Sequence, residues 1–167
     1  MTLEQLNDVE EEIAYSEFEK CCGASSWVIE MVNNRPYATE AQLIDMADQV
    51  WAGTDVNDWK EAFEHHPKIG DVKSLEEKFA STAGWASGEQ QSVATSNKEV
   101  IEQLAKYNEE YESKFGFIFI ACATGKSAEE MLELLKARMN NEIRDEIRIA
   151  AAEQHKITKI RLKKLLS

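Results

Sequence analysis

Helix-start signals recur along this chain and decide its fold class. A Ser or Thr followed three residues later by Glu or Gln has the spacing of a capping box, in which each side chain bonds the backbone N–H of the other residue. The pairs with this spacing are Thr39 with Gln42, Ser74 with Glu77, Ser96 with Glu99, and Ser127 with Glu130. Only two prolines and seven glycines interrupt the sequence. We therefore predict an all-α protein.

Apolar residues recur at intervals of three and four, which is the spacing of a helix with one buried face. The pattern runs over residues 43–51 before Gly53, over residues 56–63 after Asp55, and over residues 100–111. A chain of 167 residues is long enough for one substantial core, and no repeat or linker divides it. We predict a single compact helical domain over residues 1–167.

One stretch departs from the helical pattern. Residues 115–123 form a continuous apolar run (Phe-Gly-Phe-Ile-Phe-Ile-Ala-Cys-Ala) with a glycine at its second position. The run is too apolar for an exposed loop, and its backbone groups need hydrogen-bond partners where they are buried. We predict a short buried non-helical segment there. Residues 81–91 also read as a loop at first, and we expect a helix to begin near Gly88.

The net charge excludes two classes of partner. Asp and Glu outnumber Lys and Arg by 31 to 19, which gives a formal charge of −12. Such a surface repels nucleic acid and anionic membranes, so we expect neither as a partner. No apolar run is long enough to span a membrane. A small anionic substrate would need a local cationic pocket.

The cysteines indicate a compartment. Cys21 and Cys22 are adjacent and Cys122 stands alone, which is not a disulfide framework, and the N-terminus shows no secretory leader. We therefore expect a reducing interior and a cytoplasmic protein. Nucleophilic catalysis by Cys22 or Cys122 is disfavoured, because neither has a basic neighbour in the sequence.

The segment His65-His66-Pro67-Lys68-Ile69-Gly70 carries the first candidate for chemistry. Pro67 disfavours helical backbone at the residue before it, so a preceding helix should stop there and hold His66 at its end. An imidazole in that place can point into a cleft, and it titrates near neutral pH. The alternative is that His66 only caps helix carbonyls and complements the helix dipole.

Two further residues could join His66. Glu89, in a loop at residues 85–91, could orient the imidazole or accept hydrogen bonds from a urea-like N–H pair. Arg161 could bind a carboxylate through its guanidinium fork. It lies in a basic stretch, residues 156–164, which is also typical of a helix C-terminus. The sequence alone leaves open whether the three side chains meet in space.

A metal site is a competing interpretation. His65, His66 and Asp71 could be ligands, but adjacent histidines before a proline seldom face one ion, and the i, i+4 spacing of helical zinc ligands is missing. A phosphate-binding loop is excluded, because Gly125-Lys126-Ser127 has no glycine five positions earlier. We expect no metal.

Separated motifs occur in a fixed order along nearly the whole chain. They are Phe18 with Cys21-Cys22 and Ser26-Trp27, Arg35-Pro36-Tyr37, His66-Pro67-Lys68-Ile69-Gly70, Trp85 with Glu89-Gln90, Asn108 through Tyr111 to Phe115-Gly116-Phe117, and Ile160-Arg161-Leu162. This ordered set resembles the 2-oxo-4-hydroxy-4-carboxy-5-ureidoimidazoline (OHCU) decarboxylase family. Two positions depart from the family pattern: Ala86 stands where serine is frequent, and Ile118 where proline is frequent.

The resemblance implies an all-α homodimer that converts a small anionic ureidoimidazoline, OHCU, to S-allantoin and CO₂ in urate catabolism. It implies no cofactor, because the ring C=N bond of this substrate can accept the electron pair left by CO₂. It makes His66 the general acid/base, Glu89 the holder of the His66 tautomer and the ureido group, and Arg161 the anchor for substrate oxygens. The substrate-binding residues that it implies are Pro67, Ala86, Ser87, Gly88, Gln90, Phe119, Ile120, Ala121, Cys122 and Ala123.

Two other functions are kept as alternatives. The first is an acidic helical binding or scaffold protein, in which His66 is a structural cap and no turnover occurs. The second is a decarboxylase on the same scaffold that acts on a related ureido acid.

Overall fold

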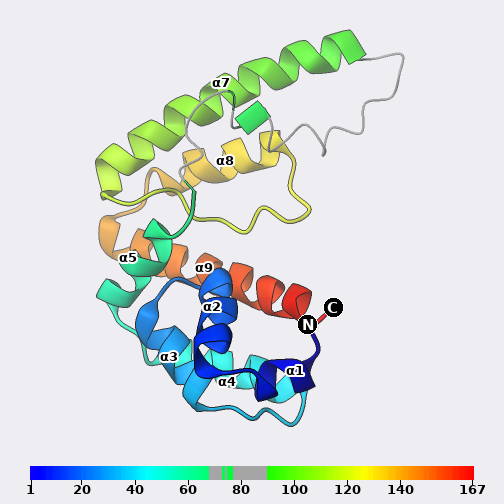
Figure 1. Ribbon diagram of the computed structural model, residues 1–167. Coiled ribbons are helices and arrows are strands. Elements are labelled where there is room, and N and C mark those ends of the chain that lie inside the picture. Colours follow the sequence, from blue (N-terminus) through cyan, green and yellow to red (C-terminus); the bar gives the residue numbers. More distant parts are fainter. Residues whose placement is uncertain (68–72, 74, 77–89) are drawn as a thin grey trace. The chain divides into compact units, whose positions relative to one another are not determined.

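The structure, a computed structural model, describes residues 1–67, 73, 75–76 and 90–167, without the side chains of residues 90–97. Within those ranges it contains helices and no strand (Figure 1), which confirms the all-α prediction. The helices are α1 (Leu3–Asp8), α2 (Glu11–Cys21), α3 (Ser25–Asn33), α4 (Glu40–Ala52), α5 (Val56–Glu64), α7 (Gln90–Phe115), α8 (Ala128–Arg138) and α9 (Ile143–Leu165). None of them is long and apolar enough to cross a membrane.

Most of the predicted helix starts that fall in these ranges are confirmed. The hydroxyl of Thr39 accepts a hydrogen bond from the N–H of Gln42 (3.1 Å) at the start of α4, and Asp55 forms a capping box at the start of α5. Ser127 caps α8 in the same way as Thr39 caps α4. These bonds satisfy N–H groups that have no partner within the helix.

One predicted start is wrong, and one lies outside the described residues. α7 begins at Gln90, so Ser96 is an interior residue of that helix. Residues three apart are neighbours on a helix surface, so the capping spacing also arises inside a helix when no glycine or proline stops it. Ser74 and Glu77 are not among the residues that the structure describes.

The chain divides into two compact units. The first unit contains Met1–His66 and Ile147–Ser167, and the second contains Pro67–Glu146. The expectation of one domain over residues 1–167 stays a prediction.

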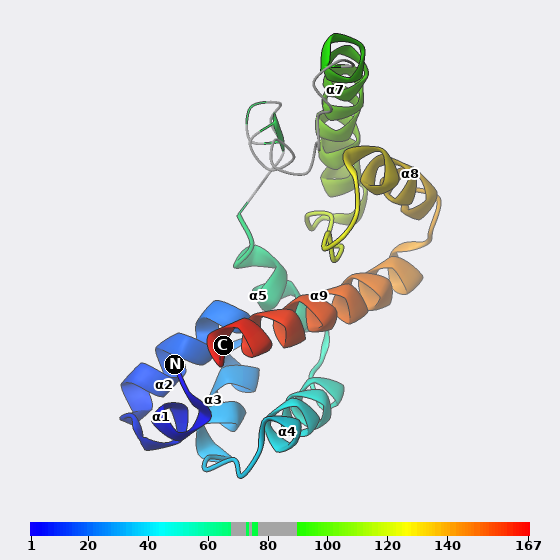
Figure 2. The ribbon, with the colours of Figure 1, turned by 90° about the vertical axis from the view of Figure 1, so that its right-hand side faces the viewer.

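The first unit is built around α3, which packs against α2, α4 and α5 (Figure 2). Trp27 on α3 is fully buried at its centre, with its ring edge-to-face against Phe18 at 6.1 Å between centroids. The indole N–H of Trp27 donates to the main-chain oxygen of Ala47 on α4 (3.4 Å). A large buried aromatic ring whose polar atom is hydrogen-bonded contributes strongly to core packing. The core around Trp27 therefore holds in place the helices against which α5 packs.

The second unit pairs α7 with α8. Apolar residues of both helices are buried, among them Ile101 and Leu104 on α7 and Leu132 and Leu135 on α8. Residues 116–127 connect the two helices and are not helical. The predicted non-helical segment is therefore confirmed, although it begins at Gly116, whose φ of 79° favours glycine, and not at Phe115.

Candidate active site

His66 lies where the sequence predicts, just beyond a helix end. α5 ends at Glu64, and the N–H groups of His65 and His66 donate to the main-chain oxygens of Ala62 (3.3 Å) and Phe63 (3.1 Å). These tightened bonds complete the last turn of the helix. The imidazole of His66 is half-buried, so its place combines a fixed backbone with access to solvent.

Two carboxylates fix α5 against the start of α3. Glu61 accepts hydrogen bonds from the N–H (2.6 Å) and the hydroxyl (2.9 Å) of Ser25, and Asp58 accepts one from the hydroxyl of Ser26 (2.7 Å). A carboxylate at a helix N-terminus also interacts favourably with the helix dipole. The two contacts therefore set the position of α5, and with it the turn that carries His66.

Gly23 lies against the same turn. A Cβ atom built on Gly23 would stand 2.1 Å from Cγ of His65 and 2.4 Å from its Cβ. Only glycine leaves room for this close approach. His65 is thus packed on the backbone of Gly23, whereas His66 faces a different set of side chains.

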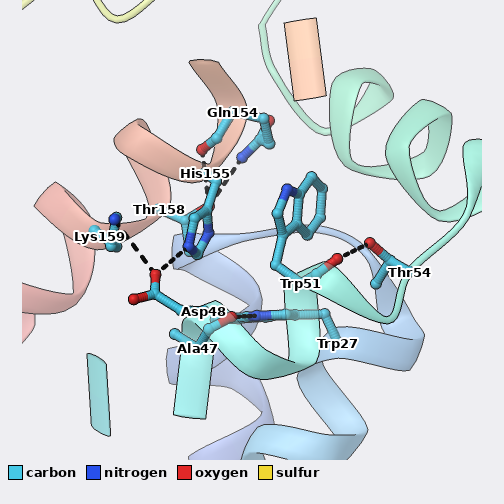
Figure 3. Close-up of polar contacts among 9 residues, drawn as sticks. All are labelled: Trp27, Ala47, Asp48, Trp51, Thr54, Gln154, His155, Thr158 and Lys159. Atoms are coloured by element: carbon cyan, nitrogen blue, oxygen red, sulfur yellow. Dashed lines mark hydrogen bonds and ion pairs between the residues drawn. The ribbon is translucent and has the colours of Figure 1, made fainter. Parts of the chain in front are cut away.

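One partner of His66 in the described part of the chain comes from α9. Nε2 of His66 lies 2.5 Å from Oε1 of Gln154, and Nε2 of Gln154 donates to the hydroxyl oxygen of Thr158 (3.1 Å). Gln154 is fully buried and Thr158 is 1% exposed. Thr158 follows Gln154 by four residues and so lies on the same face of α9, and the dashed lines in Figure 3 mark the hydrogen bonds that join the two residues. His66 therefore lies at one end of a series of hydrogen bonds that runs through the buried side chains of Gln154 and Thr158.

Arg161 continues this face of α9 by one turn and is half-buried. Burial raises the pKa of Cys21 to about 12 and that of Cys22 to about 11, and the positive charge of Arg161 opposes both shifts. The guanidinium of Arg161 thus acts on the end of α2. Thiols with raised pKa values are protonated near neutral pH, which argues further against Cys22 as a nucleophile.

His155, the residue after Gln154, belongs to a separate cluster. Its Nε2 lies 2.6 Å from Oδ1 of Asp48, its ring is stacked on Trp51 with centroids 6.0 Å apart, and Lys159 approaches the same carboxylate oxygen at 3.3 Å (Figure 3). Burial lowers the pKa of His155, and the hydrogen bond to Asp48 opposes the shift. His155 is therefore oriented by α4 and contributes to packing.

The predicted substrate-binding run at residues 119–123 lies in the second unit. Ile120 and Cys122 are buried, whereas Phe119, Ala121 and Ala123 are half-buried. Arg138 donates to the main-chain oxygen of Ile120 (2.6 Å), and the Lys126 ammonium donates to that of Cys122 (2.8 Å). The backbone of the run is thus held by cationic side chains.

Arg138, which donates to the main-chain oxygen of Ile120, is also part of a buried ion pair. Nε and Nη2 of Arg138 each lie 2.6 Å from Oε1 of Glu146, a carboxylate with no exposed surface. The phenol of Tyr111 donates to the same oxygen (2.5 Å), and Asn141 donates to Oε2 (2.9 Å). A buried carboxylate is tolerated when it is paired and hydrogen-bonded, as Glu146 is here. Nη2 of Arg138 contributes an ion-pair contact without a hydrogen bond among the described residues.

Several predicted site residues are not placed. Glu89, Ala86, Ser87 and Gly88 lie outside the described residues, as does Asp71 of the metal alternative. Gln90 is the first residue of α7, but its side chain is not described. His66 and Arg161 belong to the first unit with Gln154, and the run at residues 119–123 belongs to the second.

The sequence over residues 7–163 matches the family model described as OHCU decarboxylase. The chain belongs to the OHCU decarboxylase family. The match covers both units, and it confirms the family that the ordered motifs predict.

Relatives and solved structures agree with this membership. This OHCU decarboxylase family member is 38% identical, over 93% of its length, to the uric acid degradation bifunctional protein TTL of Arabidopsis thaliana, and 30% identical, over 99%, to the uric acid degradation bifunctional protein of Bacillus sp. (strain TB-90). It spans about half of the first relative (48%) and a third of the second (32%). A crystal structure of OHCU decarboxylase in the presence of (S)-allantoin aligns with a TM-score of 0.72 at 35% identity, covering 95% of this chain and 99% of that one.

Sequence reasoning missed Gln154 and Thr158 in this family member. A signal was present, because Gln154, Thr158 and Arg161 repeat at intervals of four and three on one face of the C-terminal helix. A polar stripe on a face that also carries buried Leu162 indicates side chains that need internal partners. The partner of Gln154 is His66, which is 88 residues away in the sequence, so no local signal indicated that these two residues pair.

Proposed function

We propose that the chain decarboxylates OHCU to S-allantoin and CO₂, as a step of urate breakdown, with His66 as the general acid/base. The observation that carries this proposal is the similarity to OHCU decarboxylase over residues 7–163, together with an imidazole held at the turn after α5 by a buried amide. The crystal structure with (S)-allantoin supports the choice of product.

The chemistry needs positioning more than a cofactor. When the C–CO₂⁻ bond breaks, its electron pair moves into the adjoining ring C=N bond, so the substrate supplies its own electron sink. The ring nitrogen then takes up a proton, and the enol left at the hydroxyl-bearing carbon becomes a carbonyl: its hydroxyl proton leaves as a proton is added to the neighbouring ring carbon that bears the ureido group. The face of that carbon that receives the proton sets the handedness of allantoin. A proton donor fixed on one side explains both the acceleration and the stereochemistry.

We assign the remaining roles as the resemblance implies them, with one exception. Arg161 binds anionic oxygens of the substrate through its guanidinium, and Glu89 binds the ureido group. The other role expected of Glu89, holding the His66 tautomer, is not kept, because Nε2 of His66 lies 2.5 Å from Oε1 of Gln154. Gln90 and the backbone of residues 119–123 complete the site with Pro67, Ala86, Ser87 and Gly88. The supporting observations are the shared helix face of Arg161 and Gln154 and the anchored backbone at Ile120.

The test is the rate of CO₂ release from freshly generated OHCU at catalytic protein concentrations, with a related ureido acid as the comparison substrate. We expect multiple turnovers with OHCU and a much lower kcat/KM with the analogue. A preference for the analogue would reassign the substrate. Release at the spontaneous rate for both compounds would favour the binding or scaffold alternative.

Activity is expected to survive exhaustive treatment with EDTA, without any added organic cofactor, because the ring C=N bond accepts the electron pair. The measurement compares kcat before and after chelation and dialysis. Loss of turnover that zinc or manganese restores would contradict this prediction and favour the metal interpretation of His65, His66 and Asp71.

We also propose that residues 1–167 act as one domain in a cytoplasmic homodimer. The family match across both units supports the single domain, and three buried free thiols fit a reducing compartment. Light scattering after size exclusion should give twice the chain mass of 19.0 kDa. A mass equal to that of one chain at micromolar concentration would rule out a stable dimer.

A further inference from the structure

We propose that Gln154 is a positioning residue that holds His66 in the tautomer with hydrogen on Nε2, so that Nδ1 is the ring nitrogen that exchanges a proton with the substrate. The catalytic half of this inference rests on the proposed function. The tautomer itself is a property of the protein and can be measured without substrate.

The amide side chain of Gln154 is buried, which limits its possible partners. Gln154 has no exposed surface, so its oxygen and its NH₂ group must find partners inside the protein. Two polar groups lie next to it: Nε2 of His66 at 2.5 Å and the hydroxyl oxygen of Thr158 at 3.1 Å. Which end of the amide faces which group decides the tautomer of His66.

The hydroxyl of Thr158 settles that orientation. It has one hydrogen, which it donates to the main-chain oxygen of Gln154 (3.0 Å), the residue one turn earlier on α9. Toward the amide side chain it can then only accept. The NH₂ end of Gln154 therefore faces Thr158, and the carbonyl end faces His66.

A carbonyl oxygen can only accept, so Nε2 of His66 must be the donor in the contact with Gln154. A neutral imidazole carries one N–H, and here it is on Nε2, which leaves the basic lone pair on Nδ1. His66 thus takes up the proton at Nδ1 and returns it from Nδ1. Gln154 does not touch the substrate in this account; it acts through His66.

The tautomer is tested by ¹⁵N NMR of the three imidazoles in the uniformly labelled full chain. We expect the Nε2–H form for wild-type His66 and a mixture of tautomers in Gln154→Leu. His155 is the internal reference, because its Nε2 donates to Asp48 in both proteins. Nδ1–H in wild-type His66, or an unchanged tautomer in Gln154→Leu, would overturn the inference.

Two conservative variants separate a positioning role from packing. Gln154→Glu keeps an oxygen acceptor for Nε2 and should preserve the Nε2–H form, whereas Gln154→Leu should not. Thr158→Val removes the hydroxyl that orients the amide and should weaken the tautomer preference, and Thr158→Ser should restore it. If Gln154→Glu and Gln154→Leu give the same tautomer mixture, the amide oxygen does not hold His66.

Kinetics test the catalytic half. In serine proteases, replacing the ionised group that fixes the tautomer of the catalytic histidine lowers kcat about 10⁴-fold. The Gln154 amide is neutral, so we expect a smaller effect in Gln154→Leu. There kcat should fall about 10- to 100-fold while KM changes less than about 3-fold. An unchanged kcat beside an altered tautomer would refute the catalytic half alone. Absence of turnover in the wild type would refute the proposed function, and the NMR result would still decide the tautomer.

Discussion

His66→Asn is expected to lower kcat by at least ~10²-fold, the lower end of what a positioned acid or base contributes. The fold should persist, because the bond from the N–H of residue 66 to Phe63 belongs to the backbone. The amide of the new side chain can also donate to Oε1 of Gln154. What the variant lacks is a group that exchanges protons near neutral pH. The measurement is kcat with OHCU, with a thermal unfolding curve as the check on folding.

His65→Asn is the matched control. His65 is exposed and packs on the backbone of Gly23, and it is not aimed by Pro67. This variant should lower kcat much less than His66→Asn does. The residual product of His66→Asn should also lose optical purity, since water can protonate either face. A larger loss from His65→Asn, or a single enantiomer made at full rate by His66→Asn, would show that His66 is not the proton donor.

Arg138→Met should reduce the free energy of unfolding by about 3–5 kcal/mol, the cost of leaving one partner of a buried ion pair alone. Glu146 has no exposed surface, and the donors that it would keep among the described residues are Tyr111 and Asn141. The same change releases the main-chain oxygen of Ile120. Urea unfolding of the two proteins gives the difference directly.

Two further variants make that result specific. Arg144→Met breaks contacts with Glu142 and Asp145 that are more than half exposed, and exposed pairs contribute about 0–1 kcal/mol. Adding Glu146→Gln to Arg138→Met removes the unpaired charge and should recover part of the loss. If Arg138→Met is no more destabilising than Arg144→Met, the buried pair does not stabilise the second unit.

The helices and the turn at His66 could be predicted because their signals are local. A capping side chain and its target are three residues apart, and Pro67 acts on the residue beside it, so Thr39, Ser127 and His66 are found where the pattern indicates. The error at Ser96 has the same origin. A local signal does not state whether its neighbours already form a helix.

The contacts around His66 could not be predicted, because they join residues that are distant in the sequence. The pairing with Gln154 spans 88 residues, and the contact between Ser25 and Glu61 spans 36. Such pairs depend on how α3, α5 and α9 pack, which hydrophobic periodicity does not specify. Local sequence patterns supplied His66 and Arg161 as candidates and the resemblance gave them roles, whereas Gln154 emerged only from the geometry.

The most direct test of the central claim is a circular dichroism time course of freshly generated OHCU with wild-type protein at substoichiometric concentration. The proposed function predicts that the signal of S-allantoin grows at the rate of CO₂ release and reaches the amplitude of a single enantiomer. A final amplitude near zero, with CO₂ released at the spontaneous rate, would contradict it.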